Sequence, residues 1–280
     1  MQPAQSYRHI AVRPIAGALG AEISGVNAAA PLSDDVIDEI RAAYLAHLVI
    51  FLRGQTLTPA QLLAFARRFG EAVEYPNLLG LPECPYVTPV VKLPHERRNF
   101  GGVWHSDTAY LERPPMGSML YAVTIPPVGG DTLFANQYLA WEELSEGLRA
   151  TLAGLRAVNS SQKAEASKTR EDRQLAGGVE NKVLVGRHPV ARVHPETGRT
   201  ALYVNLGHTT HFEGWTPEES APLLAHLFSH QTRPEYTCRF QWTVGALAFW
   251  DNRCAQHNPV NDYHGYERVM HRVTLAGGIP

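Results

Sequence analysis

Apolar residues in the first 70 positions follow two different spacings. Residues 8–25 form short apolar stretches broken by glycines, which predict short strands. After Ser33 the apolar residues recur at helical spacing, and Thr58 begins a second helical stretch that ends before Gly70. Between the two helices, residues 48–52 are continuously apolar, so we expect a short buried strand there.

The pattern changes after this point. Residues 71–102 carry many Pro, Gly and Asn with weak periodicity, which predicts a long loop, and long loops in compact domains usually carry function. Helices are expected at 138–155 and at 216–230, where Thr216 and Glu219 form a capping box. Short strands are expected at 102–110, 118–125, 132–136, 188–205 (a hairpin), 235–242, 246–252 and 268–277.

Many short strands with a few helices predict one barrel or sandwich with helices packed outside it. The 280 residues fit a single domain, 1–280, and we find no internal repeat. Residues 160–182 are polar and nearly free of large apolar side chains. Because strands resume after them, we expect a mobile insertion that acts as a lid rather than a linker between domains.

Composition excludes several classes of protein. Hydrophobic residues make up 44% and charged residues 19%, as in ordinary soluble domains. The net charge of −2 and the lack of a Lys/Arg run argue against nucleic acid as a partner. No apolar run approaches about 20 residues, so we expect no transmembrane helix. Three widely spaced cysteines and no signal peptide favour a cytoplasmic protein.

The sharpest candidate for chemistry is His105-Ser106-Asp107. Residues two apart on a strand face the same side, so both side chains can point at one metal. An imidazole and a carboxylate suit Fe(II), and a second histidine would complete a facial triad with open coordination sites. Alone the triplet is weak evidence, because a surface strand with two solvated polar groups is the more common explanation. Two similar triplets, 194–196 and 211–213, are better explained by a turn and by a helix start.

Two more patterns suggest site residues, but each is weak evidence alone. His257 follows an apolar strand, where sites tend to be built, although a capping or surface role is the commoner one for a lone histidine. In the last strand, Arg268, Met270, Arg272 and Thr274 share one face. Such a face is usually solvated. The alternative is an anion site, because arginine binds carboxylates through a planar fork.

Four motifs place the sequence beside a known family. WHSD (104–107), GGDT (129–132), FWDNRCAQH (249–257) and ERVMHRVTLAG (267–277) resemble, in order and spacing, the taurine dioxygenase and TfdA-type family of iron/2-oxoglutarate oxygenases. The resemblance covers nearly the whole chain. It implies a mainly β fold with flanking helices around a double-stranded β-helix, or jelly roll.

The resemblance also implies a catalytic centre. His105, Asp107 and His257 would hold Fe(II), with 2-oxoglutarate as co-substrate and O2 as oxidant. Arg268 would pair with the distal carboxylate of 2-oxoglutarate, helped by the hydroxyl of Thr132. The implied reaction is hydroxylation of a small organic substrate with release of succinate and CO2.

The substrate is less closely defined. The resemblance places Arg272 near the iron, within reach of an acidic substrate group, and Trp250 as a wall of the site. Tyr75 and His208 stand where taurine enzymes of the family carry different pocket residues, which puts taurine itself in doubt. We therefore expect an anionic substrate such as a sulfonate, a sulfate ester, an aryloxyalkanoate or a similar acid.

Two alternatives remain open from the sequence. A jelly-roll metalloenzyme that is not an oxygenase would need the triad but not Arg268 and Thr132. A binding homologue could keep the fold and lose the chemistry, although all three ligand positions are intact. We also expect a homo-oligomer, a dimer or tetramer, that takes a small molecule and neither nucleic acid nor a membrane.

Overall fold

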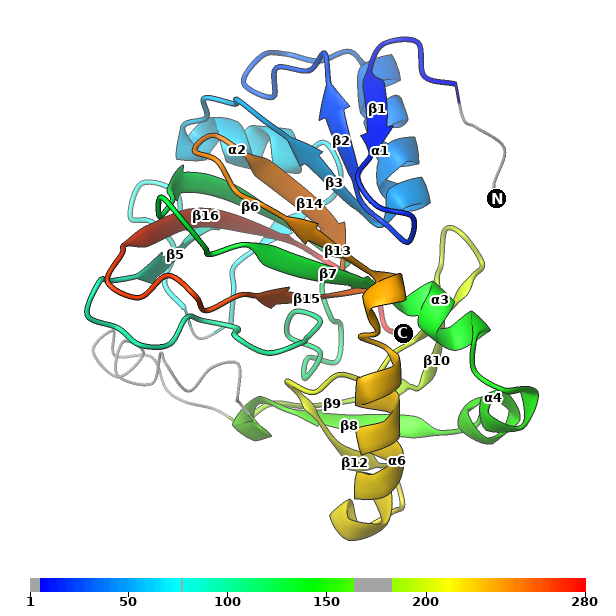
Figure 1. Ribbon diagram of the computed structural model, residues 1–280. Coiled ribbons are helices and arrows are strands. Elements are labelled where there is room, and N and C mark those ends of the chain that lie inside the picture. The colour runs from blue at the N-terminus through cyan, green and yellow to red at the C-terminus, as the bar shows by residue number, and fades with distance from the viewer. Residues whose placement is uncertain (1–5, 77, 164–182) are drawn as a thin grey trace.

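The computed structural model describes residues 6–76, 78–163 and 183–280 (Figure 1). Its largest sheet has eight strands in the order β1-β2-β3-β14-β6-β16-β4, with β5 also paired to β16. β2 and β3 run parallel, and the other neighbours are antiparallel. The strands are β1 (Ala11–Pro14), β2 (Ala21–Ser24), β3 (Val49–Leu52), β4 (Ala72–Val73), β5 (Val87–Lys92), β6 (Gly117–Thr124), β14 (Leu247–Asp251) and β16 (Arg268–Leu275).

A second sheet lies against one face of the first, as the layered arrows of Figure 1 show. It consists of β13 (Thr237–Phe240), β7 (Thr132–Asn136) and β15 (Ala255–Pro259). The core between the two sheets is aromatic: Phe51 stacks on Phe240 with ring centroids 3.9 Å apart and meets Phe134 edge-on at 5.6 Å. Burying each such ring is worth roughly 1.5–3 kcal/mol. This two-sheet core confirms the predicted mainly β jelly roll.

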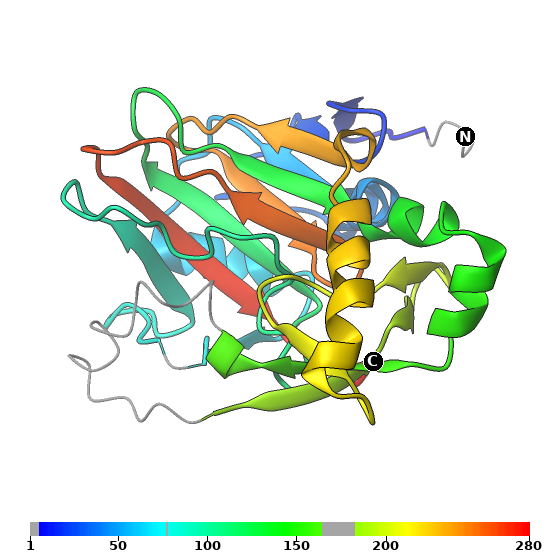
Figure 2. The ribbon, with the colours of Figure 1, turned by 60° about the horizontal axis from the view of Figure 1, so that its bottom comes forward.

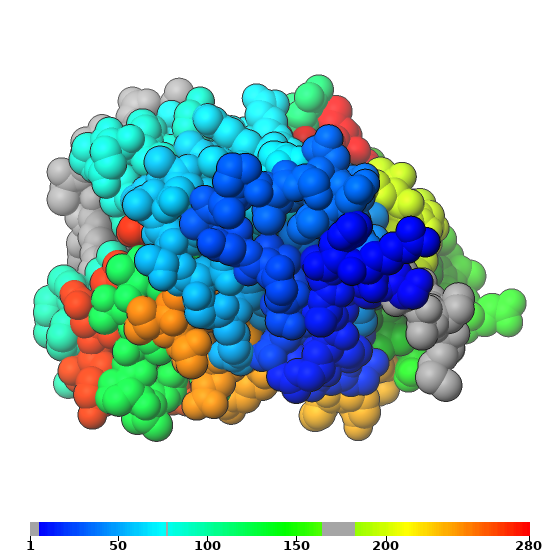
Figure 3. Space-filling model, turned by 90° about the horizontal axis from the view of Figure 1, so that it is seen from above, coloured from blue at the N-terminus to red at the C-terminus, as the bar shows by residue number. Residues whose placement is uncertain are grey.

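Two helices cover the opposite face of the large sheet. They are α1 (Asp34–His47) and α2 (Pro59–Ala66), and Figure 3 looks onto the N-terminal segments, in blue, that cover this side. Tyr44 of α1 stacks on Phe249 of β14 at 4.0 Å. β3 is apolar throughout because both of its faces are buried. Ile50 and Leu52 pack toward the helices, and Val49 and Phe51 pack toward the second sheet.

The rest of the chain forms a smaller layer beside the jelly roll. Its three-stranded sheet has the order β12-β8-β9, and α6 packs across it (Figure 2). Leu224 and Leu227 of α6 share one apolar cluster with Phe212 of β12. The elements here are α3 (Gln137–Glu142), α4 (Glu146–Leu152), β8 (Arg156–Ser160), η1 (Ser161–Lys163), β9 (Val185–Pro189), β10 (Ala191–Val193), β11 (Thr200–Leu202), β12 (Thr209–Phe212), α6 (Pro217–His230) and η2 (Pro234–Tyr236).

Several elements follow the sequence prediction and its physical reasons. α6 begins at the predicted capping box, in which the Thr216 side chain accepts from the Glu219 N–H and Glu219 accepts from the Thr216 N–H. β10 and β11 form the predicted hairpin. α2 begins at Pro59, directly after its expected cap Thr58, but ends at Ala66, because the next residues continue in tighter turns.

Other elements differ from the prediction. The strand expected at 102–110 is wrong: this stretch is irregular except for one bridge at His105. The loop expected at 71–102 contains β4 and β5, and β5 is an edge strand that tolerates Pro89. The helix expected at 138–155 is two helices, because Ser145 caps a new one by accepting from the Leu148 N–H. β8, β12 and β15 were not predicted as strands.

Two further expectations concern the insertion at 160–182 and the absence of a transmembrane helix. Most of the expected insertion 160–182 lies outside the described residues, which stop at 163 and resume at 183. Within the described parts of the chain, no helix combines the length and apolar character needed to span a membrane.

Candidate active site

Two histidines from distant parts of the chain are joined through their backbones. The N–H of His105 donates to the carbonyl of His257 at 3.0 Å, and the N–H of His257 donates to the carbonyl of His105 at 2.9 Å. This bridge extends the β13-β7-β15 sheet by one residue beyond β15. Bridged residues present their side chains on the same face, so the imidazole centroids lie 4.1 Å apart.

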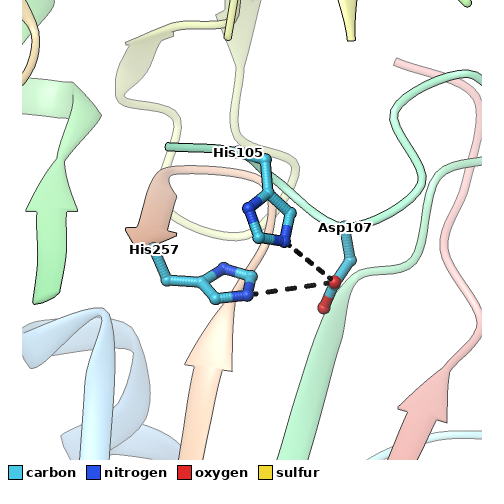
Figure 4. A group of neighbouring side chains, drawn as sticks. All are labelled: His105, Asp107 and His257. Atoms are coloured by element: carbon cyan, nitrogen blue, oxygen red, sulfur yellow. Dashed lines mark ion pairs between the residues drawn. The ribbon is translucent and has the colours of Figure 1, made fainter. Parts of the chain in front are cut away.

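Asp107 completes the group (Figure 4). Its Oδ1 lies 3.8 Å from Nε2 of His105 and 4.0 Å from Nε2 of His257. The ligand atoms of all three residues fall within 4.8 Å of one another and all three side chains are buried. A cation about 2 Å from each donor fits between them, and two imidazoles with one carboxylate are the donor set of non-haem Fe(II) oxygenases.

The two imidazoles are prepared to act as ligands. Nδ1 of His105 donates to the carbonyl of Val103 at 2.7 Å, which leaves the lone pair of Nε2 facing Asp107. Burial lowers the pKa of His105 and lowers that of His257 well below its usual value. Both rings are therefore neutral near pH 7, as metal coordination requires.

The Asp107 carboxylate is held on its other side. Ser118 of β6 donates from Oγ to Oδ2 of Asp107 at 2.7 Å, and Asn252 donates from Nδ2 to that serine oxygen at 3.1 Å. Oδ1 of Asn252 accepts from the Asp107 N–H at 3.2 Å and from the Trp250 indole at 2.9 Å. Sequence reasoning missed Ser118 and Asn252. A serine at the start of an apolar strand carries no sign of this role, whereas Asn252 lies inside the FWDN motif.

The surrounding charges keep Asp107 ionised. Burial alone would raise the pKa of this carboxyl, but Arg272, the two histidines and the Ser118 hydroxyl together lower it to about 2. The chain turns sharply after it, because Thr108 adopts φ 42° in the left-handed region. Such a conformation costs roughly 1–3 kcal/mol in a non-glycine residue and is typical of functional sites.

A small cavity opens beside the triad. The lining comes from both sheets of the jelly roll and from the segment before His105. It brings together six of the predicted site residues: His105, His257, Thr132, Trp250, Arg268 and Arg272.

Arg268 is the anion-binding candidate in this cavity. It is 4% exposed on β16, and its Nε and Nη2 have no hydrogen-bond partner within the described residues. Burial lowers the pKa of its guanidinium. Thr132 lines the same cavity, and its Oγ1 accepts from the indole of Trp242 at 2.9 Å. A buried guanidinium with open donors is stabilised by an anion, so the solvated-face alternative for this strand is wrong.

Arg272 lies nearer the triad on the same face of β16. Its Nη1 donates to Oδ1 of Asp107 at 3.3 Å, and its guanidinium carbon lies 3.7 Å from the ring centroid of Tyr75. Phe100 flanks it at 5.6 Å. In the described parts of the chain, Nε and Nη2 of Arg272 have no hydrogen-bond partner. Two donors therefore remain for a second anion.

His208 and Trp250 border the triad on two sides. The His208 ring lies 5.9 Å from that of His105 and 5.1 Å from that of Tyr110. Burial and the neighbouring His105 lower the pKa of His208 to about 3, so this ring is neutral. Trp250 is 1% exposed with its ring 4.7 Å from that of His257. Tyr75, His208 and Trp250 thus all lie at the predicted site.

A second buried group has a structural role. His194 donates from Nε2 to Oδ2 of Asp251 at 3.0 Å, and Arg253 binds both oxygens of the same carboxylate. Nδ1 of His194 accepts from the N–H groups of Glu196 and Thr197 in the β10–β11 turn, as the turn explanation of this triplet predicts. The group fixes this turn beside the segment that carries Asn252.

Comparison with known proteins agrees with this geometry. The family model described as "Taurine catabolism dioxygenase TauD, TfdA family" matches residues 11–274. An alpha-ketoglutarate-dependent sulfate ester dioxygenase from Pseudomonas putida is 38% identical over 96% of this chain and 90% of its own. An alkylsulfatase from Acinetobacter baylyi is 35% identical over 97% and 86%, respectively. A solved structure from Burkholderia xenovorans, described as a putative alpha-ketoglutarate-dependent taurine dioxygenase, aligns with a TM-score of 0.83 and 39% identity, covering 96% of this chain and 93% of that one.

Proposed function

The chain belongs to the taurine catabolism dioxygenase TauD, TfdA family, and we propose that it oxidises a small sulfate ester at an Fe(II) centre. It is a 2-oxoglutarate-dependent dioxygenase that acts on an anionic substrate. The observation that carries the proposal is the placement of two buried guanidiniums, from Arg268 and Arg272, in one cavity with the triad.

The metal would be held by His105, Asp107 and His257. Their donor atoms converge, both imidazoles are neutral and the carboxylate is ionised, which fits Fe(II). When bound, the iron supplies activation of O2 coupled to the oxidative decarboxylation of 2-oxoglutarate to succinate and CO2. The protein holds the ligands, orients the organic partners and excludes water.

The co-substrate would lie along the cavity toward Arg268. The free Nε and Nη2 of that guanidinium would bind the distal carboxylate of 2-oxoglutarate, and the Thr132 hydroxyl would donate to the same group. A jelly-roll metalloenzyme of another class would need neither residue. The open donors of Arg268 therefore favour the oxygenase over that alternative.

The substrate anion would bind Arg272. Its two free nitrogens match two oxygens of a sulfate group, and the rings of Tyr75 and Phe100 shield the guanidinium from water. Hydroxylation of the carbon that bears the ester oxygen gives a product that breaks into an aldehyde and free sulfate. His208 and Trp250 would form part of the wall against the rest of the substrate.

A substrate panel tests this proposal. The protein is supplied with Fe(II), 2-oxoglutarate and O2, and succinate and free sulfate are measured with alkyl sulfates, taurine and other sulfonates, aryloxyalkanoates and neutral alcohols. We expect alkyl sulfates to stimulate succinate formation most, with one sulfate released per succinate. Stimulation by sulfonates or aryloxyalkanoates alone would replace the substrate class, and stimulation by neutral alcohols alone would remove Arg272 from substrate binding.

The proposal also covers the domain organisation, the cellular compartment and the oligomeric state. We propose that residues 1–280 act as one domain, because the site takes residues from the first and the last thirds of the chain. The cysteines Cys84, Cys238 and Cys254 are buried and free, which fits a reducing cytoplasm. A homo-oligomer, a dimer or tetramer, without nucleic acid or membrane partners is the expected form, and light scattering on the purified protein tests the oligomeric state.

A further inference from the structure

Trp242 touches both members of the proposed 2-oxoglutarate clamp without lining the cavity itself. Its indole Nε1 donates to Oγ1 of Thr132 at 2.9 Å. The face of the same ring lies 5.7 Å from the guanidinium carbon of Arg268, within the range of a cation–π contact. The ring is 4% exposed and is held edge-on by Phe240, with ring centroids 5.0 Å apart.

This hydrogen bond restricts where the hydrogen of the Thr132 hydroxyl can point. A hydroxyl has one hydrogen to donate, and an indole N–H can only donate. Because Trp242 occupies an acceptor position of Thr132, the hydroxyl hydrogen must point elsewhere. Over the described residues, Trp242 is the hydrogen-bond partner of this hydroxyl, and Thr132 borders the cavity next to Arg268. The hydrogen is therefore free to donate into the cavity.

We propose that Trp242 is a positioning residue for the co-substrate, which turns the Thr132 hydroxyl into a donor and packs against Arg268. The inference rests on the proposed co-substrate site. Its consequence is selectivity, because a carboxylate accepts from both Thr132 and Arg268, whereas a neutral amide in its place would bring hydrogens of its own against them. Trp242 acts through these two residues and touches no reacting atom.

A double-mutant cycle separates this role from simple packing. Binding of 2-oxoglutarate is measured by calorimetry on Mn(II)-loaded protein, for wild type, Trp242→Phe, Thr132→Val and the double variant. Phenylalanine keeps an aromatic ring at this position and removes the N–H together with the five-membered ring that carries it. We expect Trp242→Phe to weaken binding about 2- to 10-fold, the usual effect of one buried hydrogen bond. In the Thr132→Val background the same change should have no further effect.

Matched measurements decide between the outcomes. Trp215→Phe changes a tryptophan that is 37% exposed and outside the site, and should leave binding unchanged. Trp242→Phe should raise KM for 2-oxoglutarate and leave kcat near wild type, whereas general damage to the fold would lower kcat. Wild-type affinity in Trp242→Phe, or effects of the two changes that simply add, would overturn the inference.

Two results keep the inference and the proposed function apart. If wild type fails to bind 2-oxoglutarate, or if Arg268→Ala binds it normally, the proposed co-substrate site is wrong. If Trp242→Phe does not fold, the indole N–H resonances of 15N-labelled Zn(II) protein replace the cycle. We expect the indole signal that shifts in Thr132→Val to shift also when 2-oxoglutarate binds to the wild-type protein. If 2-oxoglutarate leaves that signal unchanged, the positioning role of Trp242 is contradicted.

Discussion

Ser118 donates a hydrogen bond to Oδ2 of Asp107 at 2.7 Å and so turns the other oxygen of this carboxylate toward His105 and His257. The serine lies at the start of β6, in the large sheet, and is fully buried. Asn252 holds the serine oxygen in turn. The rigid sheet thereby fixes which oxygen faces the two histidines and the proposed metal position, although Asp107 itself lies in an irregular segment.

Removing this hydrogen bond should weaken the metal site. In Ser118→Ala the Asp107 carboxylate loses its fixed orientation, and we expect Mn(II) affinity to fall about 10- to 100-fold, as for other groups that orient metal ligands. Mn(II) binding followed by electron paramagnetic resonance measures it without turnover. Ser229→Ala changes an exposed serine of α6 and is the matched control. Equal affinities in the two variants would show that Asp107 does not need Ser118.

Loss of one imidazole should abolish metal binding and spare the fold. In His105→Ala the backbone bridge to His257 remains, and Arg272 still compensates the charge of Asp107. We expect Mn(II) binding at least about 100-fold weaker, with circular dichroism and the thermal midpoint near those of metal-free wild type. His226→Ala, on the exposed side of α6, should bind metal normally. Full metal content in His105→Ala would remove this residue from the ligand set.

The sequence predicts the three proposed metal ligands, but the structure does not support the local reasons for choosing them. His105 and Asp107 do not share a strand: His105 forms a single bridge with His257, and Asp107 lies in a turn two residues later. His257 lies within β15 and not at a strand end. A pairing between residues so far apart leaves no local periodicity, so only the combined match of several motifs to a family joined them.

The arginine face of β16 shows a second limit. Arg268 and Arg272 lie on the same face of this strand. Their spacing in the sequence would be the same if that face were solvated or if it pointed between two sheets. Only the three-dimensional packing buries them. β5, which pairs with β16 in the same sheet, was not predicted, because it contains Pro89 and lies in a stretch with weak periodicity. Helix starts were predictable because Thr58 and Thr216 act through neighbours three residues away.

The co-substrate should depend on one guanidinium. Arg268→Ala removes a buried charged donor whose proposed partner is the distal carboxylate, a loss of about 2–5 kcal/mol or at least about 30-fold in affinity. Calorimetry with Mn(II)-loaded protein measures the Kd for 2-oxoglutarate. Arg268→Lys should recover only part of it, because an ammonium lacks the planar fork. Arg13→Ala, at an arginine with a 73% exposed side chain, is the control, and an unchanged Kd in Arg268→Ala would place the anion site elsewhere.

His188 should make the fold sensitive to acid. It lies in β9, 1% exposed, and donates from Nε2 to the carbonyls of Ala109 and Leu111, just after Asp107, the proposed metal ligand. Burial lowers its pKa from 6.5 to about 4. Between these values the unfolded chain binds a proton that the folded chain does not, so stability is present above pH 6.5 and falls as the pH drops toward 4.

The matched variant is His188→Gln, which keeps an N–H donor and cannot titrate. Both proteins are unfolded with urea in metal-free form at several pH values, so that the remaining histidines contribute equally. From pH 7 to pH 4 we expect wild type to lose about 3 kcal/mol more free energy of unfolding than the variant, the amount that corresponds to the shift. Parallel pH profiles would mean that His188 already accepts a proton in the folded protein, and its hydrogen bonds to the segment after Asp107 would then be compatible with the charged ring.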